Sequence, residues 1–171
     1  HVYVQKPLTH NVKEARMLSE LAKKNKIVTQ MGNQGASNPE QKMIQKWIKD
    51  GRIGKVSTVY TWTNRPVWAQ GSPMPSPDPT QKPDGMDWDL WIGPAKNNGY
   101  TPGLHAFSWR GYWDYGTGSL GDMGCHIMDV PIKALGMFEP YSIEASVPRV
   151  PYVGDYTPAP IYDDSCPPSS Y

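Results

Sequence analysis

Apolar residues in the first 31 positions follow a strand pattern, then a helix pattern, then a strand pattern again. Residues 1–5 form a short β-rich run that Lys6-Pro7 ends, because proline cannot donate to a ladder. An amphipathic helix is expected to follow, with a buried stripe of Val12, Ala15, Leu18, Leu21 and Ala22. Residues 27–31 predict the second strand. The three segments predict a βαβ unit with parallel strands.

The ends of the first helix carry typical signals. Asn11 is the expected N-cap, and Glu14 stands three residues later as in a capping box. Lys23 and Lys24 lie where the negative end of the helix dipole stabilises positive charge. These signals indicate that the helix extends from about residue 12 to residue 24.

A second helix is expected after the polar turn at residues 32–35. It begins at Ser37 or Asn38, has Pro39 in its first turn and ends at Gly51. Its inward positions are Met43, Ile44, Trp47 and Ile48. Residues 55–64, rich in valine, threonine and aromatic side chains, predict a further strand.

The second half of the chain is less regular. Residues 66–102 contain many prolines and are too long for a simple connection, which indicates a functional loop or an arm over a neighbour. Residues 87–94 form an aromatic docking turn whose Trp88 and Trp91 are expected in the core. A helix reaching about Leu135 with a kink near Pro131, then a strand at residues 142–147, complete the predicted elements. The tail from Pro148 has no clear pattern.

Residues 116–129 hold the strongest candidate chemistry, because a glycine-rich turn there leads into a helix. Asp122 and His126 are four residues apart and Asp129 follows three later, so all three are expected on one helix face. A carboxylate beside an imidazole suits proton transfer by histidine. An ordinary surface ion pair has the same spacing. A divalent metal site is also conceivable, but no histidine or cysteine cluster completes a ligand set, so we expect none.

The same stretch contains Gly116, Gly118 and Gly121 in the G-x-G-x-x-G spacing of dinucleotide-binding turns. That fingerprint requires an apolar strand immediately before the turn. Residues 109–115 are aromatic and charged, without alternation. We therefore interpret the glycines as a helix-leading turn and not as a dinucleotide site.

Composition excludes several classes of protein. With 17 basic and 16 acidic residues and no basic run, nothing points to nucleic acid. No apolar run approaches the ~18 residues that a membrane helix needs. The cysteines, Cys125 and Cys166, have no metal-ligand spacing and leave the cellular compartment open.

Taken in order, five segments resemble the Gfo/Idh/MocA oxidoreductases, the glucose-fructose oxidoreductase and inositol dehydrogenase group. The likeness extends over nearly all 171 residues. The matching segments are Gln5-Lys6-Pro7, Gly51–Lys55, Asp87–Ala95, Trp109-Arg110 and the helix with Asp122 and His126. The order and separation of these short motifs make the resemblance persuasive.

The resemblance implies an α/β plus α+β fold. Residues 1–35 would be the last βαβ of a Rossmann-type dinucleotide-binding domain. Residues 36–171 would be part of a substrate and oligomerisation domain, an open, mostly antiparallel sheet with helices on one face. The chain is then expected to be a fragment whose glycine fingerprint for NAD or NADP lies upstream, and the intact protein is expected to be a homo-oligomer.

The resemblance also implies the oxidation of a secondary alcohol of a sugar or polyol, with NAD or NADP as cofactor. Lys6, Asp122 and His126 match the catalytic residues. Lys6, Pro7 and Gln34 are expected to contact the cofactor, because ligands collect at the carboxyl ends of parallel strands. Residue type and proximity in sequence suggest that Trp109, Arg110 and Trp113 shape a sugar pocket.

One residue departs from the family pattern, since Gln5 replaces the usual glutamate and removes a charge beside Lys6. Retention of Lys6 favours the redox branch over the related glycosidases that use bound NAD. A non-catalytic carbohydrate-binding or assembly module with the same fold is the other alternative. The sequence upstream of this chain would distinguish the enzyme from the module, because a strand followed by an intact G-x-G-x-x-G would support the enzyme.

Overall fold

The computed structural model describes residues 1–68, 70–146 and 163–167. They divide into two compact units, each described by itself. Unit 1 comprises His1–Thr63 and Met123–Ala145, and unit 2 comprises Asn64–Asp122 and Ser146–Tyr171. Among the described residues, no helix is long and apolar enough to span a bilayer.

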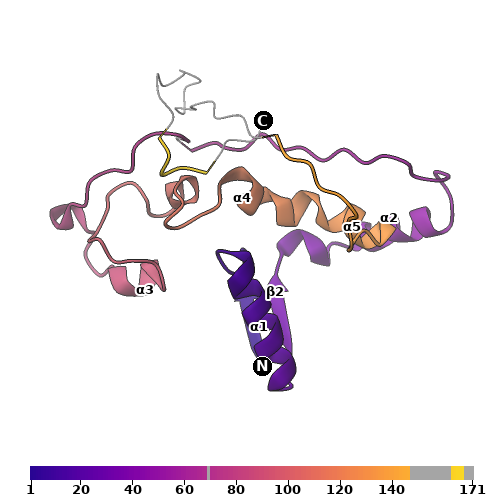
Figure 1. The fold of residues 1–171 in the computed structure, drawn as a ribbon, viewed down its shortest axis with the longest axis horizontal. Coiled ribbons are helices and arrows are strands. Elements are labelled where there is room, and N and C mark those ends of the chain that lie inside the picture. Colours follow the sequence, from indigo (N-terminus) through magenta and orange to yellow (C-terminus); the bar gives the residue numbers. More distant parts are fainter. Residues whose placement is uncertain (69, 147–162, 168–171) are drawn as a thin grey trace. The chain divides into compact units, whose positions relative to one another are not determined.

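Unit 1 begins with the predicted βαβ arrangement (Figure 1). Strand β1 (Val2–Gln5) pairs in parallel with β2 (Thr29–Gly32), and helix α1 (Val12–Lys24) connects them. The register places Val2 opposite Thr29 and Gln5 opposite Gly32. The second strand therefore begins two residues later than its sequence pattern predicts. The carboxyl ends of both strands meet at one edge.

The N-terminus of α1 confirms the predicted cap. The side-chain oxygen of Asn11 accepts a hydrogen bond from the backbone N–H of Glu14 at 3.0 Å. The Glu14 carboxylate in turn accepts from the backbone N–H of His10 at 2.8 Å, one residue before the position of a standard capping box. Both bonds satisfy N–H groups at the start of the helix.

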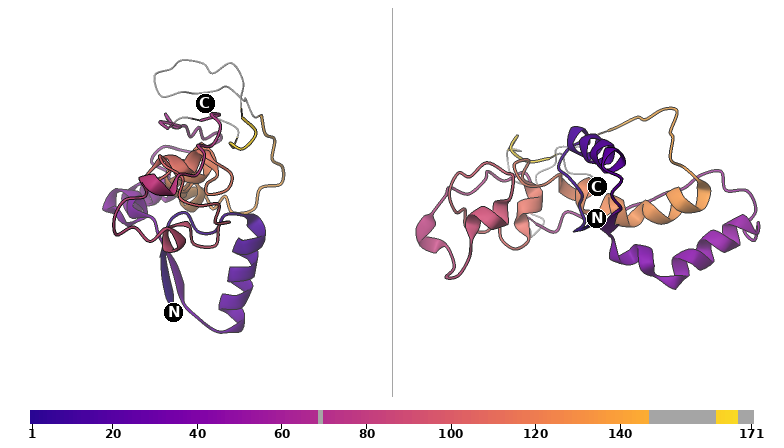
Figure 2. Two further views of the ribbon diagram at one scale, coloured as in Figure 1. Left: turned by 90° about the vertical axis from the view of Figure 1, so that its left-hand side faces the viewer. Right: turned by 90° about the horizontal axis from the view of Figure 1, so that it is seen from below.

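The apolar stripe of α1 is not buried as predicted. Leu18 and Leu21 are each 47% exposed, and no residue of the helix is buried. They line an apolar hollow together with Val2 and Val4 of β1. The left view of Figure 2 shows α1 running alongside the strand pair. A two-stranded sheet is too narrow to cover an amphipathic helix, which explains the exposure.

Two further helices of unit 1 pack against each other, α2 (Pro39–Lys49) and α5 (Asp129–Leu135). A short 3-10 helix, η1 (Gln34–Ser37), precedes α2, and Pro39 takes the expected first-turn position. The prediction of four inward residues is wrong for Met43 and Trp47, which are 43% and 40% exposed. The single short partner α5 covers only part of the apolar face.

Unit 2 contains short helices joined by irregular chain. They are η2 (Pro79–Gln81), α3 (Trp88–Ile92), η3 (Ser108–Gly111) and the first half of α4 (Gly118–Ile127). The predicted docking turn is thus a helix, capped by the Asp87 carboxylate, which accepts from the N–H of Leu90 at 2.9 Å. The boundary between the units falls inside α4, after Asp122.

The core of unit 2 is built on aromatic side chains, as the sequence predicts for Trp88. Its buried members are Trp88, Ile92, Tyr100, Leu104, Tyr112 and Cys166. Trp91 stacks on Trp88 with ring centroids 4.7 Å apart and packs against this core. The aromatic cluster of residues 87–94 is therefore structural.

The expected antiparallel sheet is absent from the described part of the chain. Residues 55–64 and 142–146 form neither helix nor strand, and Val147 lies outside the described residues, as does most of the tail from Pro148. Tyr60 and Trp62 are 81% and 80% exposed. A strand needs a neighbour to satisfy its backbone groups, so β propensity alone does not produce one. The described fold is a small α/β arrangement.

A fully buried glutamine joins three segments of unit 2. Gln70 accepts a hydrogen bond from Trp68 Nε1 at 2.7 Å and donates to the carbonyls of Pro167 and Gly111 at 2.8 and 3.3 Å. We expect Gln70→Leu to lower the free energy of unfolding of the complete natural protein by about 2–3 kcal/mol, because these buried groups lose their partners. Denaturant unfolding measures the loss.

Gln81→Leu is the matched control for Gln70→Leu. Gln81 is exposed and donates only to Asp78 at 2.7 Å in an element of the same unit. A surface change of this kind is expected to alter stability by at most about 0.5 kcal/mol. Equal losses for the two variants would contradict the bridging role of Gln70.

The buried cysteine of the core is expected to be unreactive. Cys166 is 3% exposed and its Sγ lies 3.3 Å from the Ser72 carbonyl. Burial raises the pKa of the Cys166 thiol, so little reactive thiolate forms at pH 8. Iodoacetamide should modify Cys166 at least ~10-fold more slowly than half-buried Cys125, as measured by peptide mass spectrometry. The expectation would be refuted if Cys166 and Cys125 reacted at similar rates in the native protein and unfolding did not speed the modification of Cys166.

Candidate functional site

The carboxyl ends of β1 and β2 bring the predicted lysine beside the polar turn. The backbone N–H of Lys6 donates to the Gly32 carbonyl at 3.1 Å, which extends the strand pairing by one residue. Lys6 is half-buried, and the Lys6–Pro7 peptide bond is cis. Pro7 and Gln34 are exposed, and Gln34 begins η1. Lys6 therefore leaves the sheet at the edge where Asn33 follows β2.

Asn33 links this edge to the helix that carries His126. Its Nδ2 donates a hydrogen bond of 2.6 Å to the carbonyl oxygen of Cys125, 92 positions later in the chain. Cys125 and His126 are neighbours in the last turn of α4. Through Gly32 and Asn33, the segments that contain Lys6 and His126 are thus tied to the same strand end.

The glycine-rich turn before α4 has a steric origin. A Cβ at Gly116 would lie 2.7 Å from Cα of Arg110, and Gly118 has φ +65°, a region that favours glycine. No strand precedes the turn, since residues 109–115 form η3 and turns. The strand that a dinucleotide fingerprint requires is therefore absent before this turn. These glycines instead let the start of α4 approach Arg110 closely.

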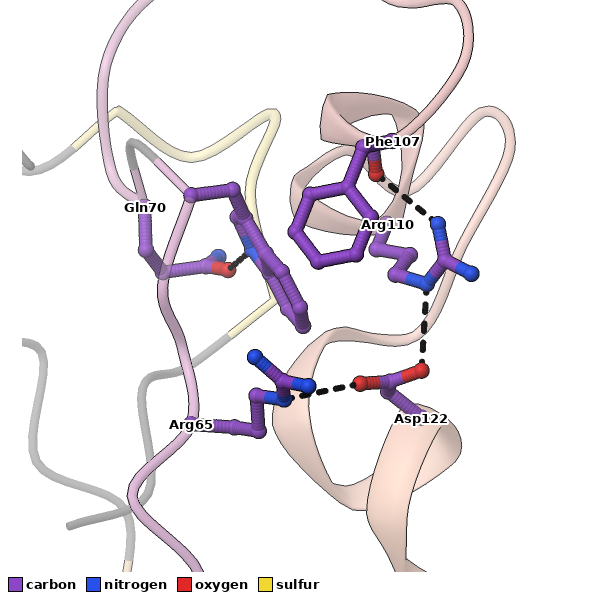
Figure 3. A network of polar contacts seen from close by, with 6 residues as sticks. Arg65, Gln70, Phe107, Arg110 and Asp122 are labelled. Atoms are coloured by element: carbon purple, nitrogen blue, oxygen red, sulfur yellow. Dashed lines mark hydrogen bonds and ion pairs between the residues drawn. The ribbon is translucent and has the colours of Figure 1, made fainter.

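Asp122 is the centre of a charged cluster in unit 2. It is 8% exposed, and its Oδ1 accepts a hydrogen bond from Arg110 Nε at 3.0 Å. Arg65 Nε lies 3.5 Å from Oδ2 of the same carboxylate. Figure 3 shows the two guanidinium groups approaching the carboxylate from different directions. Two cations therefore compensate the buried negative charge.

Aromatic rings support the arginines. The Arg110 guanidinium lies 4.5 Å from the Trp109 ring centroid and 4.7 Å from that of Phe107, and its Nη1 donates to the Phe107 carbonyl at 3.0 Å. Arg65 lies over the Phe107 ring as well, at 5.8 Å. Stacking and hydrogen bonds together restrict how Arg110 can move while it holds Asp122.

Asp129 lies in a separate short helix, so its predicted place on one face with Asp122 and His126 stays a prediction. Helix α4 ends at Ile127 and α5 begins at Asp129, so the expected kink is a break three residues before Pro131. Proline has no N–H to bond the carbonyl of Ile127, which explains the break. Asp129 instead pairs with Lys133 at 2.8 Å.

Among the described residues, no group of three or more histidine, cysteine, aspartate or glutamate side chains is placed to hold a metal ion. Asp122 and His126 remain four positions apart on α4, on one face of that helix. The hypothesis that Asp122 orients His126 stays a prediction.

The structure groups some predicted residues and reveals others that sequence reasoning missed. Trp109 and Arg110 belong to the Asp122 cluster, whereas Trp113 is 43% exposed. Arg65 and Phe107 carried no motif that would have placed them beside Asp122. The bond from Asn33 to Cys125 had no sequence signal, because the partner is a backbone carbonyl that any residue can provide.

Comparison with known families identifies the class of protein. The sequence model described as the oxidoreductase family, C-terminal alpha/beta domain, matches residues 38–149, which is more than half of the chain. The chain belongs to the Gfo/Idh/MocA oxidoreductase family, as the sequence motifs predicted. No curated protein matches the chain. An α/β domain of an oxidoreductase is thus established.

The Asp122 cluster makes a testable contribution to stability. Replacing Arg110 with alanine leaves the buried carboxylate with Arg65 at 3.5 Å and should destabilise the complete natural protein by about 1.5–3 kcal/mol. Lys46→Ala, which breaks the exposed Lys46–Asp50 pair, is the control and should cost at most about 0.5 kcal/mol. Thermal and denaturant unfolding of both variants measure the difference, and an effect of Arg110→Ala no larger than the control would argue against a structural role.

Proposed function

We propose that this chain is part of an NAD(P)-dependent dehydrogenase that oxidises a secondary alcohol of a sugar or polyol. Membership of the oxidoreductase family gives the reaction class. The proposal extends it to a nicotinamide cofactor and a CH–OH donor. The intact protein is proposed to be a homo-oligomer, as the family resemblance implies.

One observation carries the proposal. Two hydrogen bonds involve Gly32 and Asn33, which are consecutive residues at the end of β2. Lys6 N donates to Gly32 O at 3.1 Å, and Asn33 Nδ2 donates to Cys125 O at 2.6 Å. Lys6 belongs to the first pair, and His126 directly follows Cys125 of the second. This connection supports a common site for the Lys6 ammonium and the His126 imidazole, whose residues lie 120 positions apart in sequence.

The proposed chemistry assigns one task to each side chain. His126 accepts the proton of the substrate hydroxyl, because imidazole is the side chain best suited to proton transfer near neutral pH. Lys6 donates a hydrogen bond to the same oxygen and stabilises the negative charge that develops there. Asp122, which Arg110 and Arg65 hold in place, orients the imidazole of His126.

The strand edge also fits a nicotinamide cofactor. Asn33 Oδ1 is shielded from solvent and has no hydrogen-bond partner among the described residues, so this strand edge has a polar atom that still needs a donor. Lys6, Pro7 and Gln34 surround the same strand ends, where ligands of parallel sheets bind. When bound, the nicotinamide would supply the hydride acceptor for the carbon-bound hydrogen.

The proposed substrate class follows from the side chains of unit 2. Trp109 and Trp113 offer aromatic surface, and Arg110 offers donors that suit hydroxyl groups. Trp113 is 43% exposed and so is accessible. Trp109 already stacks with Arg110 on one side, which leaves it a supporting role in shaping a sugar pocket.

The proposal predicts that Lys6→Ala and His126→Ala each reduce turnover of the complete natural protein at least ~100-fold, the usual scale for loss of an acid–base group. Candidate sugars and polyols are first screened with NAD and NADP, following absorbance of the reduced cofactor. The best substrate is then used to compare the variants.

Lys24→Ala and His10→Ala serve as matched controls, because both residues are exposed in unit 1 and neither is a candidate site residue. Both should keep wild-type turnover. Near-normal rates for the Lys6 and His126 variants would overturn the proposal. Release of a sugar from a glycoside without accumulation of reduced cofactor would indicate a glycosidase instead.

A further inference from the structure

The last turn of α4 receives a side-chain hydrogen bond from the residue that follows β2. The last four carbonyl groups of a helix lack an intrahelical partner, and α4 ends at Ile127. The Met128 N–H bonds the Gly124 carbonyl at 3.0 Å and so satisfies the first of them. The Cys125 carbonyl comes next, and Asn33 Nδ2 donates to it at 2.6 Å. The side chain of Asn33, the residue after β2, thereby caps the turn that contains His126.

The donor is itself held firmly. Asn33 follows Gly32 directly, and Gly32 is paired with Gln5 in the sheet and accepts from the Lys6 N–H. Gly32 is the one buried residue of β2, so this strand end is shielded from solvent. The asparagine side chain has only two rotatable bonds. The separation between the Lys6 backbone and the last turn of α4 is therefore fixed with little freedom.

We propose that Asn33 is a positioning residue, which sets the distance between the His126 base and the Lys6 ammonium. This inference rests on the function proposed above and adds a role that Asn33 performs without touching the substrate hydroxyl. Proton and hydride transfer require reacting atoms at about 3–3.5 Å, and a misplacement of 1 Å costs on the order of 10²-fold in rate. If the end of α4 were not held, the His126 imidazole would be displaced by a distance of about this size.

The amide group is also specific in its orientation. Nδ2 faces the Cys125 carbonyl, and a rotated amide would place oxygen against oxygen. An aspartate at this position has nearly the same size but offers no N–H. It would leave the Cys125 carbonyl facing a carboxylate oxygen, which is repulsive. Asn33→Asp thus removes the donor with little change in volume.

The test compares Asn33→Ala, Asn33→Asp and Asn33→Gln in the complete natural protein. We expect the alanine and aspartate variants to lower kcat about 10- to 100-fold with a smaller change in KM, because the base is misplaced while substrate contacts persist. Asn33→Gln keeps an amide donor on a longer arm and should recover part of the lost kcat. The pH dependence of kcat is recorded for each variant.

Asn25 provides a matched control in the same unit. Its Nδ2 donates to the Leu21 carbonyl at 2.9 Å, so it also caps a helix C-terminus, that of α1, with an asparagine side chain. Asn25→Ala removes an exposed, local cap, so it should lower stability less than Asn33→Ala and leave kcat unchanged. A similar loss of kcat in both variants would show a general structural effect and overturn the positioning role.

A double variant separates this inference from the proposed function. If Asn33 acts through His126, adding Asn33→Ala to His126→Ala should lower kcat by less than twofold. Independent multiplication of the two effects would overturn the inference while the base assignment stands. Wild-type turnover of His126→Ala alone would instead overturn the function proposed above, whatever Asn33 does.

Discussion

The hydrogen bond from Asn33 to the Cys125 carbonyl is the contact on which the site in unit 1 depends. It joins a strand end to a helix end that are 92 positions apart in the chain. Both partners are groups that secondary structure leaves unsatisfied, the first side chain after a strand and one of the last carbonyls of a helix. The hydrogen bond between them satisfies both groups and fixes the position of the strand end relative to the helix end. The proposed acid–base chemistry uses that geometry.

The Asp122 cluster imposes a second, electrostatic constraint. A carboxylate that is 8% exposed must be compensated, and here two guanidinium groups provide the compensation. Both arginines pack against the Phe107 ring, so their positions are restricted by more than the ion pair. Asp122 is then well suited to hold the start of α4 in place. Its polar contacts also explain why the glycine turn approaches Arg110 so closely.

Sequence reasoning succeeded where the determinants were local. The βαβ order, the Asn11 cap and the Pro39 position follow from periodicity and capping chemistry within a few residues. It also excluded the false dinucleotide fingerprint, because the required strand can be judged from seven preceding residues.

Sequence reasoning failed where the structure of a segment depends on residues far away in the chain. Residues 55–64 have the composition of a strand, but no neighbouring strand among the described residues satisfies their backbone groups. The stripe of α1 is amphipathic, but the burial of Leu18 and Leu21 depends on how much sheet faces them. Arg65 pairs with Asp122 although the two residues are 57 positions apart in sequence, and no spacing rule predicts such a pair. The catalytic candidates were found by family resemblance, whereas the contacts that arrange them required coordinates.

The arrangement argues for an enzyme over a purely structural module. Burying a charged group is a poor source of stability, because desolvation offsets most of the attraction between partners. A module that only binds or assembles would gain as much from apolar residues at positions 65, 110 and 122. Instead unit 2 retains a buried aspartate that two arginines hold, and unit 1 ties the end of α4 to the strand edge beside Lys6. Such polar, closely held groups have a physical use when a proton must move between fixed positions.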